Sequence, residues 1–264
     1  MRTFGHFHLR GQTDGAAFYG ELLANGETVR ALQHPPWIDP DTAAIHGADH
    51  LLSELEIGIP IAPGKLLAVG RNYHAHAAER GATAPTSPMT WLMGPTSLLA
   101  HNGVVELPFP GHKVDFEAEL CIVIGKRAKN VSVEQASKYI FGYTLGLDIS
   151  DRDIQDAEKQ FYRAKSFDTF TPVGPFVYSG IEPGNLVVTL HQNGGLRQDG
   201  NTREMIFSAS EIVSFLSQGT MLLPGDTIMT GTPAGVGPIH DGDHLEARIG
   251  PFAPLIVTVR NAMS

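Results

Sequence analysis

The chain has 264 residues, 42% of them hydrophobic, which is enough to bury a sizeable core in one large domain or in a main domain with a small attachment. Its 28 acidic against 19 basic residues give a formal net charge of −9, and the basic residues are scattered, so we expect no nucleic-acid partner. No run approaches the roughly 18 apolar residues of a membrane span and the start lacks an apolar signal region, so we expect no membrane attachment.

The first part of the chain, residues 1–62, is predicted to be a small accessory module that contains β-strands. Within it, the segment "FYGELLANGETVRAL" has alternating apolar residues around Asn25-Gly26, a pair typical of a hairpin turn. The acidic stretch "DPDTAAIHGADHLLSELEI", residues 39–57, has helical tendency.

Prolines 60 and 63 then interrupt the chain before the buried-strand pattern "KLLAVG", so we place a boundary there and expect residues 63–264 to form one catalytic unit. The 29 glycines and 18 prolines, spread among short apolar runs, predict an α+β, β-rich fold. The further strand candidates are "AELCIVIG", "NLVVTLHQNG", "GDTIMTG" and "HLEARIG", and the helix candidates are "SVEQASKYI" and "SASEIVSFLSQ", each opened by a serine N-cap.

The stretch "AVGRNYHAHAAER" gathers an arginine, two histidines and a glutamate. A helix that begins near Tyr73 would place His76 and Glu79 three residues apart on one face, where the carboxylate could orient the imidazole as a general base. A surface helix with an ordinary polar pair explains the same spacing. His74 and His76, like His6 and His8, also form an H-x-H pair, but no further zinc ligands with suitable spacing follow.

The segment "KVDFEAELCIVIGK" carries two carboxylates at the entrance of a buried strand. Because side chains alternate along a strand, Glu117 and Glu119 should project on the same side, with Asp115 in register. Such a pair can share a hard cation through oxygen ligands, or it can be the solvated edge of an amphipathic strand. The sole cysteine, Cys121, follows in the apolar run and cannot form an intrachain disulfide, which fits a cytoplasmic protein with a buried, inert thiol.

A second acidic cluster, "GLDISDRDIQ", follows the strand-like "FGYTLGL". A calcium-loop interpretation fails because the position that needs glycine is Asp153 and the twelfth position is Lys159. What remains is Asp148 as an acidic group and Arg152, Asp153 and Gln155 as orienting or substrate-binding groups, or else an ordinary turn before a helix.

Two later segments have the composition of binding loops. "YRAKSFDTFTPVGP" places Lys165 among aromatic and turn residues, where a desolvated ammonium could neutralise an anionic substrate, although a surface lysine is the ordinary alternative. "MTGTPAGVGP" offers Thr232 and backbone N–H groups in a glycine-rich turn that could hold a carboxylate. Neither a phosphate-binding P-loop, a dinucleotide-binding fingerprint nor a G-x-S-x-G elbow is present.

From about Gly64 onward the sequence resembles the fumarylacetoacetate hydrolase superfamily. The resemblance rests on "GRNYHAHAAE", "DFEAELCIVIGK", "GYTLGLDISDRDIQ", "AKSFDTFTPVGP", "NTREMIF" and "LLPGDTIMTGTPAGV", in that order. It implies a mixed β-roll catalytic fold, a homodimer, and a divalent cation, Mg²⁺ or Mn²⁺ with Ca²⁺ as a further candidate. The implied cation ligands are Glu117, Glu119 and Asp148.

The resemblance also implies roles for the remaining site residues. His76 and Glu79 would activate water with Lys165 as a third catalytic group, and a small anionic 2-oxo or diketo acid would be bound by Arg71, Arg152, Gln155 and Thr232. The chain departs from the pattern where many relatives have an "F-L-K" segment, because it has Trp91, Leu92 and Met93, and where Phe161 replaces a frequent tryptophan. We expect Met93 and Phe161 to line the pocket and to affect the choice of substrate.

The expected function is metal-dependent hydrolysis of a carbon–carbon bond in a β-diketo acid, such as an acylpyruvate or a compound like fumarylacetoacetate or fumarylpyruvate, in the catabolism of aromatic compounds. The same enolate chemistry would serve isomerisation of a 2-hydroxyhepta-2,4-diene-1,7-dioate type of substrate, or decarboxylation of such a compound or of oxaloacetate. A metal-binding structural oligomer is the non-enzymatic alternative, and the presence of both His76 and Glu79 argues against it.

Overall fold

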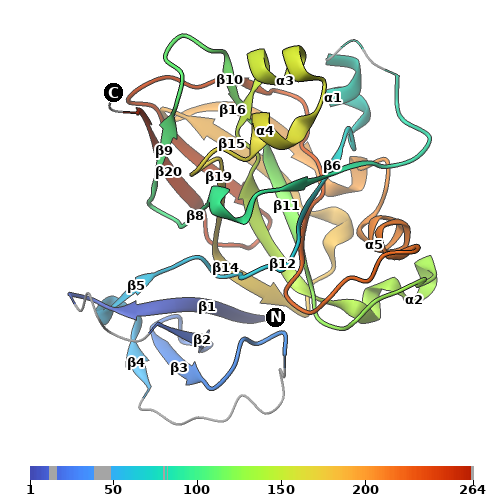
Figure 1. Ribbon diagram of the computed structural model, residues 1–264. Coiled ribbons are helices and arrows are strands. Elements are labelled where there is room, and N and C mark those ends of the chain that lie inside the picture. The colour runs from blue at the N-terminus through green and yellow to red at the C-terminus, as the bar shows by residue number, and fades with distance from the viewer. Residues whose placement is uncertain (12–16, 39–48, 80, 82, 263–264) are drawn as a thin grey trace.

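The computed structural model describes residues 1–11, 17–38, 49–79, 81 and 83–262, and β-strands dominate it (Figure 1). The strands form three sheets, so the strand-rich α+β fold expected from the sequence is confirmed. Among the described residues, no helix is both long and apolar enough to cross a membrane. The homodimer and the cytoplasmic location stay predictions.

The largest sheet has twelve strands and runs from the N-terminal segment into the centre of the molecule. Its order is β4-β3-β2-β1-β14-β12-β11-β17-β6-β7, while β5 pairs with β1 and β8 pairs with β14. The bounds are β1 Arg2–Leu9, β2 Phe18–Leu22, β3 Thr28–Leu32, β4 His50–Leu51, β5 Leu55–Ile57, β6 Leu66–Gly70, β7 Met89–Met93, β8 Leu98–Leu99, β11 Ala118–Ile124, β12 Ile140–Leu147, β14 Thr171–Ser179 and β17 Thr227–Met229.

The N-terminal strands join this sheet through antiparallel pairing of β1 with β14, in which Phe4 lies opposite Val177. The predicted hairpin is confirmed, because β2 and β3 pair antiparallel and Gly26 in the turn has a φ of 72°. The helical expectation for the acidic stretch is wrong over residues 49–57, which form β4, a 3₁₀ turn at Leu52–Glu54 and β5. Residues 39–48 of that stretch lie outside the described residues. The predicted boundary between residues 62 and 63 stays a prediction.

Two smaller sheets complete the β-structure. The order of the three-stranded sheet is β13-β10-β18, and that of the five-stranded sheet is β16-β15-β19-β20-β9. The bounds are β9 Val104–Leu107, β10 Val114–Phe116, β13 Ser150–Asp151, β15 Val187–Gln192, β16 Gly195–Asn201, β18 Gly237–Pro238, β19 His244–Ile249 and β20 Leu255–Asn261. All the strand candidates named from the sequence therefore contain strands.

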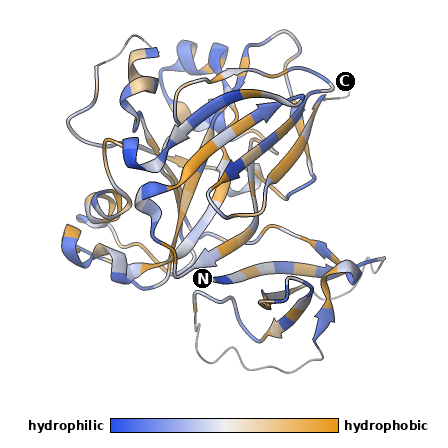
Figure 2. Cartoon of the chain, turned by 180° about the vertical axis from the view of Figure 1, so that it is seen from behind, coloured by the Kyte–Doolittle hydropathy of each residue, from blue (hydrophilic) through white to orange (hydrophobic). Residues whose placement is uncertain are grey.

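The core is organised around β11, all of whose residues are buried. Its alternating side chains separate two apolar environments, as expected for a strand covered on both faces. Leu120 and Ile122 pack in the large cluster that also contains residues of the five-stranded sheet, whereas Cys121 packs with Met229. Hydrophobic colour accordingly follows the central strands in Figure 2. Glu119, two residues before Cys121, projects from the same face of the sheet as Cys121 and therefore away from the larger cluster.

The helices are short. Their bounds are α1 His74–Glu79, α2 Val133–Ala136, α3 Arg152–Glu158, α4 Phe161–Lys165 and α5 Ala209–Ser217, with 3₁₀ turns at Leu52–Glu54, Pro95–Ser97, Ser137–Tyr139, Pro183–Asn185 and Thr202–Glu204. The predicted serine cap of α5 is confirmed, because Ser208 and Glu211 form a reciprocal capping box. Ser132 is the N-cap residue of α2, as predicted, but its side chain forms no capping hydrogen bond to the helix backbone. Figure 1 shows α1, α3 and α4 together at the end of the molecule opposite the N-terminal strands.

The close approach of β12 to β14 predicts a strong destabilisation by Gly142→Ala. A Cβ atom at Gly142 would lie 2.3 Å from the carbonyl oxygen of Tyr178, and this backbone atom cannot move without disturbing the sheet. We expect the free energy of unfolding to fall by about 1–3 kcal/mol, the usual cost of overpacking, in urea denaturation. Gly184→Ala is the matched control, because no atom lies within 4 Å of its built Cβ. Equal stability of the two variants would contradict the packing described here.

Candidate active site

A small cavity of about 40 Å³ lies between α1 on one side and α3 and α4 on the other. All of the residues predicted for the site line it except Glu79 and Asp148, which lie behind the cavity wall in contact with lining residues. The lining residues are Val69, Gly70, Arg71, Asn72, His76, Met89, Trp91, Glu117, Glu119, Arg152, Gln155, Phe161, Lys165, Gly231 and Thr232.

Three buried carboxylates lie close together at the cavity, and two of them, Glu117 and Glu119, line it. One oxygen each from Glu117, Glu119 and Asp148 lies within 4.8 Å of the others, and none of the three side chains is more than 8% exposed. The two glutamates flank the start of β11 with the two-residue spacing of a strand, and Asp148 directly follows β12, the neighbour of β11. Adjacent antiparallel strands thus bring together acidic groups that are some 30 residues apart in the sequence.

The electrostatics of the three carboxyls differ. Burial raises the pKa of Glu119 well above its ordinary value, and the charges of Asp148 and Glu117 raise it further. Burial also raises the pKa of Asp148, to about 6, although Lys165 opposes the shift. For Glu117 burial acts in the same direction, but the neighbouring charges of Lys165 and Arg152 outweigh it and the pKa lies below its ordinary value.

Two buried cations account for this difference. The ammonium of Lys165, on α4, contacts Oδ2 of Asp148 at 2.5 Å and Oε2 of Glu117 at 3.1 Å, and it donates to Oγ of Ser150 at 2.7 Å. The guanidinium of Arg152, at the start of α3, contacts Oε1 of Glu117 at 2.5 Å. In the described part of the chain, the carboxylate of Glu119 accepts one hydrogen bond, from the backbone N–H of Gly231 at 2.6 Å, and forms no ion pair.

The residues present fit a divalent cation. All three converging groups offer carboxylate oxygens, the ligands preferred by Mg²⁺, Mn²⁺ and Ca²⁺. Glu119 is buried beside two further carboxylates and forms no ion pair with a residue that the structure describes, which is unfavourable unless the carboxyl is protonated or bound to a cation. Glu117, Glu119 and Asp148 are therefore the residues that would hold the cation.

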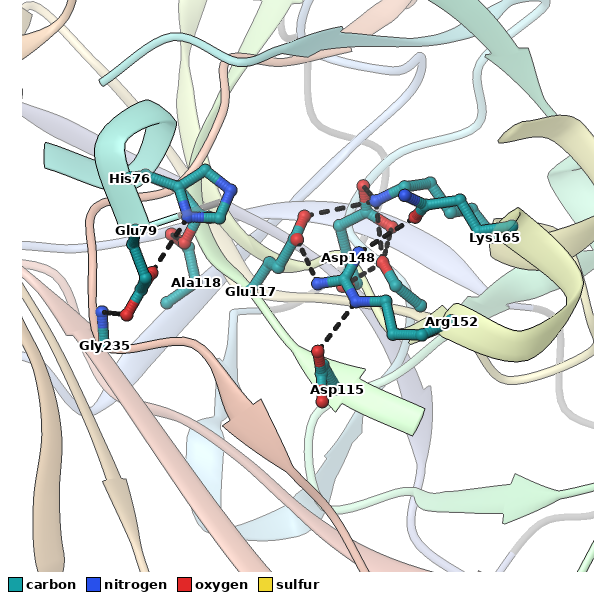
Figure 3. A network of polar contacts seen from close by, with 12 residues as sticks. His76, Glu79, Asp115, Glu117, Ala118, Asp148, Arg152, Lys165 and Gly235 are labelled. Atoms are coloured by element: carbon teal, nitrogen blue, oxygen red, sulfur yellow. Dashed lines mark hydrogen bonds and ion pairs between the residues drawn. The ribbon is translucent and has the colours of Figure 1, made fainter. Parts of the chain in front are cut away.

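The predicted pair on α1 is formed. Nδ1 of His76 lies 3.2 Å from Oε2 of Glu79, and Oε1 of Glu79 accepts the backbone N–H of Gly235 at 3.1 Å. Figure 3 shows the pair on one side of Glu117, with Arg152 and Lys165 on the other. If Nδ1 carries the proton donated to Glu79, Nε2 is left as the basic nitrogen. The arrangement is a general base oriented by a carboxylate that is itself fixed by the backbone.

The glycine-rich turn holds carboxylates of the protein itself. The N–H of Gly231 binds Glu119 and the N–H of Gly235 binds Glu79, so these two groups are engaged before any substrate arrives. Gly235 has a φ of 97°, and a Cβ there would lie 2.1 Å from the carbonyl oxygen of Arg197. The hydroxyl of Thr232 donates a hydrogen bond to the carbonyl of Ala118 and accepts one from Nε2 of Gln198. A substrate-binding role for Thr232 stays a prediction.

The other residues predicted to bind the substrate lie at the cavity. Of the two positions expected to affect specificity, one lies there and the other does not. Arg71 lines the cavity, and Gln155 does so while its Oε1 accepts from Arg152 at 2.9 Å. Phe161 lines it as expected. Met93 does not, because it is 3% exposed and packs in the apolar cluster that contains Cys121, so the expectation that it lines the pocket is wrong.

Two side chains of the cavity wall, Trp91 and Asn72, were given no role in the site from the sequence, although Trp91 was named as a departure from the family pattern. Trp91 lies with its ring 5.3 Å from Nζ of Lys165 and edge-to-face with Phe161, at a centroid distance of 5.0 Å. Asn72 is fully buried, donates to the carbonyls of Phe207 and Thr230, and accepts the N–H of Phe207. It thereby fixes the chain just before α1. An asparagine two residues after an apolar strand was the available signal, because a buried amide must find partners.

Cation binding should weaken as the pH falls from about 7 to about 5. The cation binds ionised carboxylates, whereas the pKa of Asp148 is about 6 and that of Glu119 is raised, so protons compete below pH 6. The apparent Mn²⁺ affinity should fall about tenfold per pH unit for each proton displaced. Calorimetric titration in buffers of different ionisation enthalpy would count these protons. An affinity that does not change over this range would contradict the assignment.

The chain is similar to known proteins over most of its length. Residues 65–260 match the family model described as fumarylacetoacetate (FAA) hydrolase C-terminal. Oxaloacetate tautomerase YisK of Bacillus subtilis is 37% identical over 256 residues, covering 89% of this chain and 84% of that protein.

Two solved structures extend the likeness over nearly the whole chain. The crystal structure of 2-hydroxyhepta-2,4-diene-1,7-dioate isomerase from Mycobacterium marinum has a TM-score of 0.89 at 34% identity and covers 100% of both chains. Fumarylacetoacetate hydrolase from Exiguobacterium antarcticum has a TM-score of 0.86 at 27% identity, covering 99% of this chain and 100% of that one. The relatives thus include a tautomerase, an isomerase and a hydrolase. Together with the family match, they show that this chain belongs to the fumarylacetoacetate hydrolase family.

Proposed function

We propose that this protein is a divalent-cation-dependent hydrolase that cleaves the carbon–carbon bond of an acylpyruvate. The observation that carries the proposal is the position of the His76–Glu79 pair beside the cavity that also exposes Glu117 and Glu119. This arrangement supplies both requirements of the reaction: a base for water, and a place where negative charge on a 2-oxo acid is stabilised.

The cation would supply Lewis-acid stabilisation of the negative charge that develops on the 2-oxo oxygen. His76 removes a proton from water at Nε2, while Glu79 stabilises the imidazolium through Nδ1. The resulting hydroxide attacks the distal carbonyl carbon, and the bond between this carbon and the central methylene breaks. The electron pair remains on the methylene as the pyruvate enolate, which then takes a proton, and the acyl group leaves as a carboxylic acid.

The remaining residues of the cavity bind and orient. Lys165 carries a positive charge beside the carboxylate cluster, since its pKa is raised by Asp148 and Glu117 despite the opposing effect of burial. Its ammonium can therefore offset the negative charge of the enolate. Arg71 and Gln155 line the same cavity and offer donors to the substrate carboxylate.

The mouth of the cavity favours an apolar acyl group. Met89, Trp91 and Phe161 line the cavity and also line an adjacent hollow that includes Leu92 and Tyr162. Leu92 and Tyr162 are 55% and 57% exposed, so apolar surface continues outward from the site. Burial of an acyl chain against these side chains would stabilise the complex by roughly 0.8 kcal/mol per methylene group. An acylpyruvate with an extended acyl chain fits this wall better than a short dicarboxylate such as oxaloacetate.

Tautomerisation or isomerisation of a 2-oxo acid is the second candidate, which the names of the Bacillus and Mycobacterium relatives favour. His76 could move a proton between carbon and oxygen of the same enolate without any attack by water. Decarboxylation of oxaloacetate is a further reaction that needs stabilisation of the enolate but no attacking water.

A substrate panel tests the proposal. Acylpyruvates of increasing chain length, oxaloacetate and a hydroxymuconate-type dienoate should be offered with Mg²⁺ or Mn²⁺, and the products identified. We expect kcat/KM to be highest for the longer acylpyruvates and to vanish with a chelator. Rapid tautomerisation or isomerisation without any hydrolysis would replace the proposed function by the second candidate.

A further inference from the structure

We propose that Asp115 is a positioning residue that sets the charge of the cation site through Arg152. The inference rests on the proposed cation site and concerns a carboxylate outside the cavity lining. Asp115 is 2% exposed, and its Oδ2 accepts from Nε of Arg152 at 2.7 Å. In Figure 3 it lies on the side of Arg152 away from Asp148 and Lys165.

The contacts of Arg152 show how a residue outside the cavity can act on it. The guanidinium binds a different residue with each nitrogen: Nε contacts Asp115, one terminal nitrogen contacts Glu117 at 2.5 Å, and the other contacts Gln155 at 2.9 Å. Because the group is planar and its donors are fixed relative to one another, holding Nε determines where the other two nitrogens point. Asp115 therefore orients the contacts of Arg152 with one proposed cation ligand and one proposed substrate residue.

The backbone of Asp115 is itself fixed from both sides. It lies in β10, opposite Ser150 of β13 and Pro238 of β18. Ser150 in turn contacts Lys165. The second carboxylate oxygen of Asp115, Oδ1, has no hydrogen-bond partner in the described part of the chain, so the contact with Arg152 is the role that the structure assigns to this side chain.

The charges of the site supply the second argument. The connected groups are the four carboxylates of Asp115, Glu117, Glu119 and Asp148 and the two cations Arg152 and Lys165, so the ionised cluster carries two negative charges in excess. One divalent cation balances this excess. Without Asp115, the buried charge of Arg152 would lose one of its partners. Arg152 would remain bound to Glu117, and its less compensated charge would repel a cation held by Glu117.

Mn²⁺ binding to the purified protein, measured by calorimetry or electron paramagnetic resonance, tests the inference without an activity assay. Asp115→Asn keeps the shape and an acceptor oxygen but removes the charge, and we expect the Mn²⁺ Kd to rise about 10- to 100-fold, as when an outer partner of a metal ligand is lost. Asp115→Glu restores the charge and should recover most of the affinity. Asp226→Asn is the control, a buried aspartate paired with Lys65 instead of Arg152.

A double-mutant cycle separates the charge role from general damage. If Asp115 acts through Arg152, then Asp115→Asn should change the Mn²⁺ Kd by less than about threefold in an Arg152→Met background. Where Asp115→Asn does not fold, Arg152→Lys tests the same link, because a lysine cannot contact Asp115 and Glu117 as a fork and should show the same loss.

Three outcomes overturn the inference. They are an Asp115→Asn protein that binds Mn²⁺ as tightly as the wild type, a foldable Arg152→Lys protein with unchanged affinity, and a loss of affinity of equal size with and without Arg152. A wild type that binds Mn²⁺ but hydrolyses no acylpyruvate would refute the proposed function and leave this inference standing. A wild type that binds no Mn²⁺ would refute both.

Discussion

Glu119→Gln should abolish tight cation binding and reduce turnover by about 10³-fold or more. The substitution keeps the size of the side chain and an oxygen that can accept the N–H of Gly231, but it removes the carboxylate that forms no ion pair with any described residue. Lewis-acid stabilisation of developing charge contributes several kcal/mol, and each 1.36 kcal/mol corresponds to about a factor of ten in rate. Mn²⁺ titration and steady-state kinetics with an acylpyruvate would measure both effects.

The control for this prediction is Glu106→Gln. Glu106 is a partly exposed glutamate that pairs with Arg260 on the five-stranded sheet, and its substitution should change neither property. Full activity of Glu119→Gln after exhaustive chelation would contradict the assignment of the cation site.

His76→Ala should reduce acylpyruvate hydrolysis by about 10² to 10⁴-fold, the range expected for a lost general base, while Mn²⁺ affinity stays near that of the wild type. The expectation follows from the contact between His76 and Glu79 and from the position of the imidazole in the cavity wall. His74→Ala is the matched control, since His74 is exposed on the same helix. Steady-state kinetics at saturating Mn²⁺ would measure the effect.

Oxaloacetate decarboxylation should respond differently in the same protein. It needs stabilisation of the enolate but no attacking water, so any such activity should suffer less from His76→Ala than from Asp148→Ala. Hydrolysis that survives His76→Ala would show that this residue is not the base.

Local sequence patterns predicted those parts of the site that depend on chain geometry alone. The two-residue period of a strand placed Glu117 and Glu119 together, and the three-residue spacing of a helix placed His76 beside Glu79. The same kind of reasoning identified α5, where Ser208 forms the predicted cap.

Contacts between distant segments could not be predicted in this way. The bond from Gly235 to Glu79 spans 156 residues, and it depends on a turn whose glycines were expected to bind a ligand. The link from Asp115 to Arg152 likewise depends on the pairing of β10 with β13. In both cases the sequence shows that polar groups are present, but only the packing of the sheets determines which groups meet.

The acidic stretch before residue 58 shows tertiary context overriding local propensity. Its described part has a composition that favours a helix, yet β4 pairs with β3 and β5 pairs with β1. Leu55 is 2% exposed and belongs to the main apolar cluster. Pairing with strands already present buries this leucine and satisfies the backbone, so the segment is extended. Met93 is a similar case, because its position on β7 directs it into the core instead of the cavity.

Proton NMR of an acylpyruvate incubated with the wild-type protein and Mn²⁺ tests the proposed hydrolysis most directly. We expect pyruvate and the carboxylic acid of the acyl group to appear together in equal amounts, a chelator to stop their formation, and added Mn²⁺ to restore it. An acylpyruvate that stays intact, in a protein that binds Mn²⁺ and rapidly interconverts the keto and enol forms of oxaloacetate, would contradict the proposed hydrolysis.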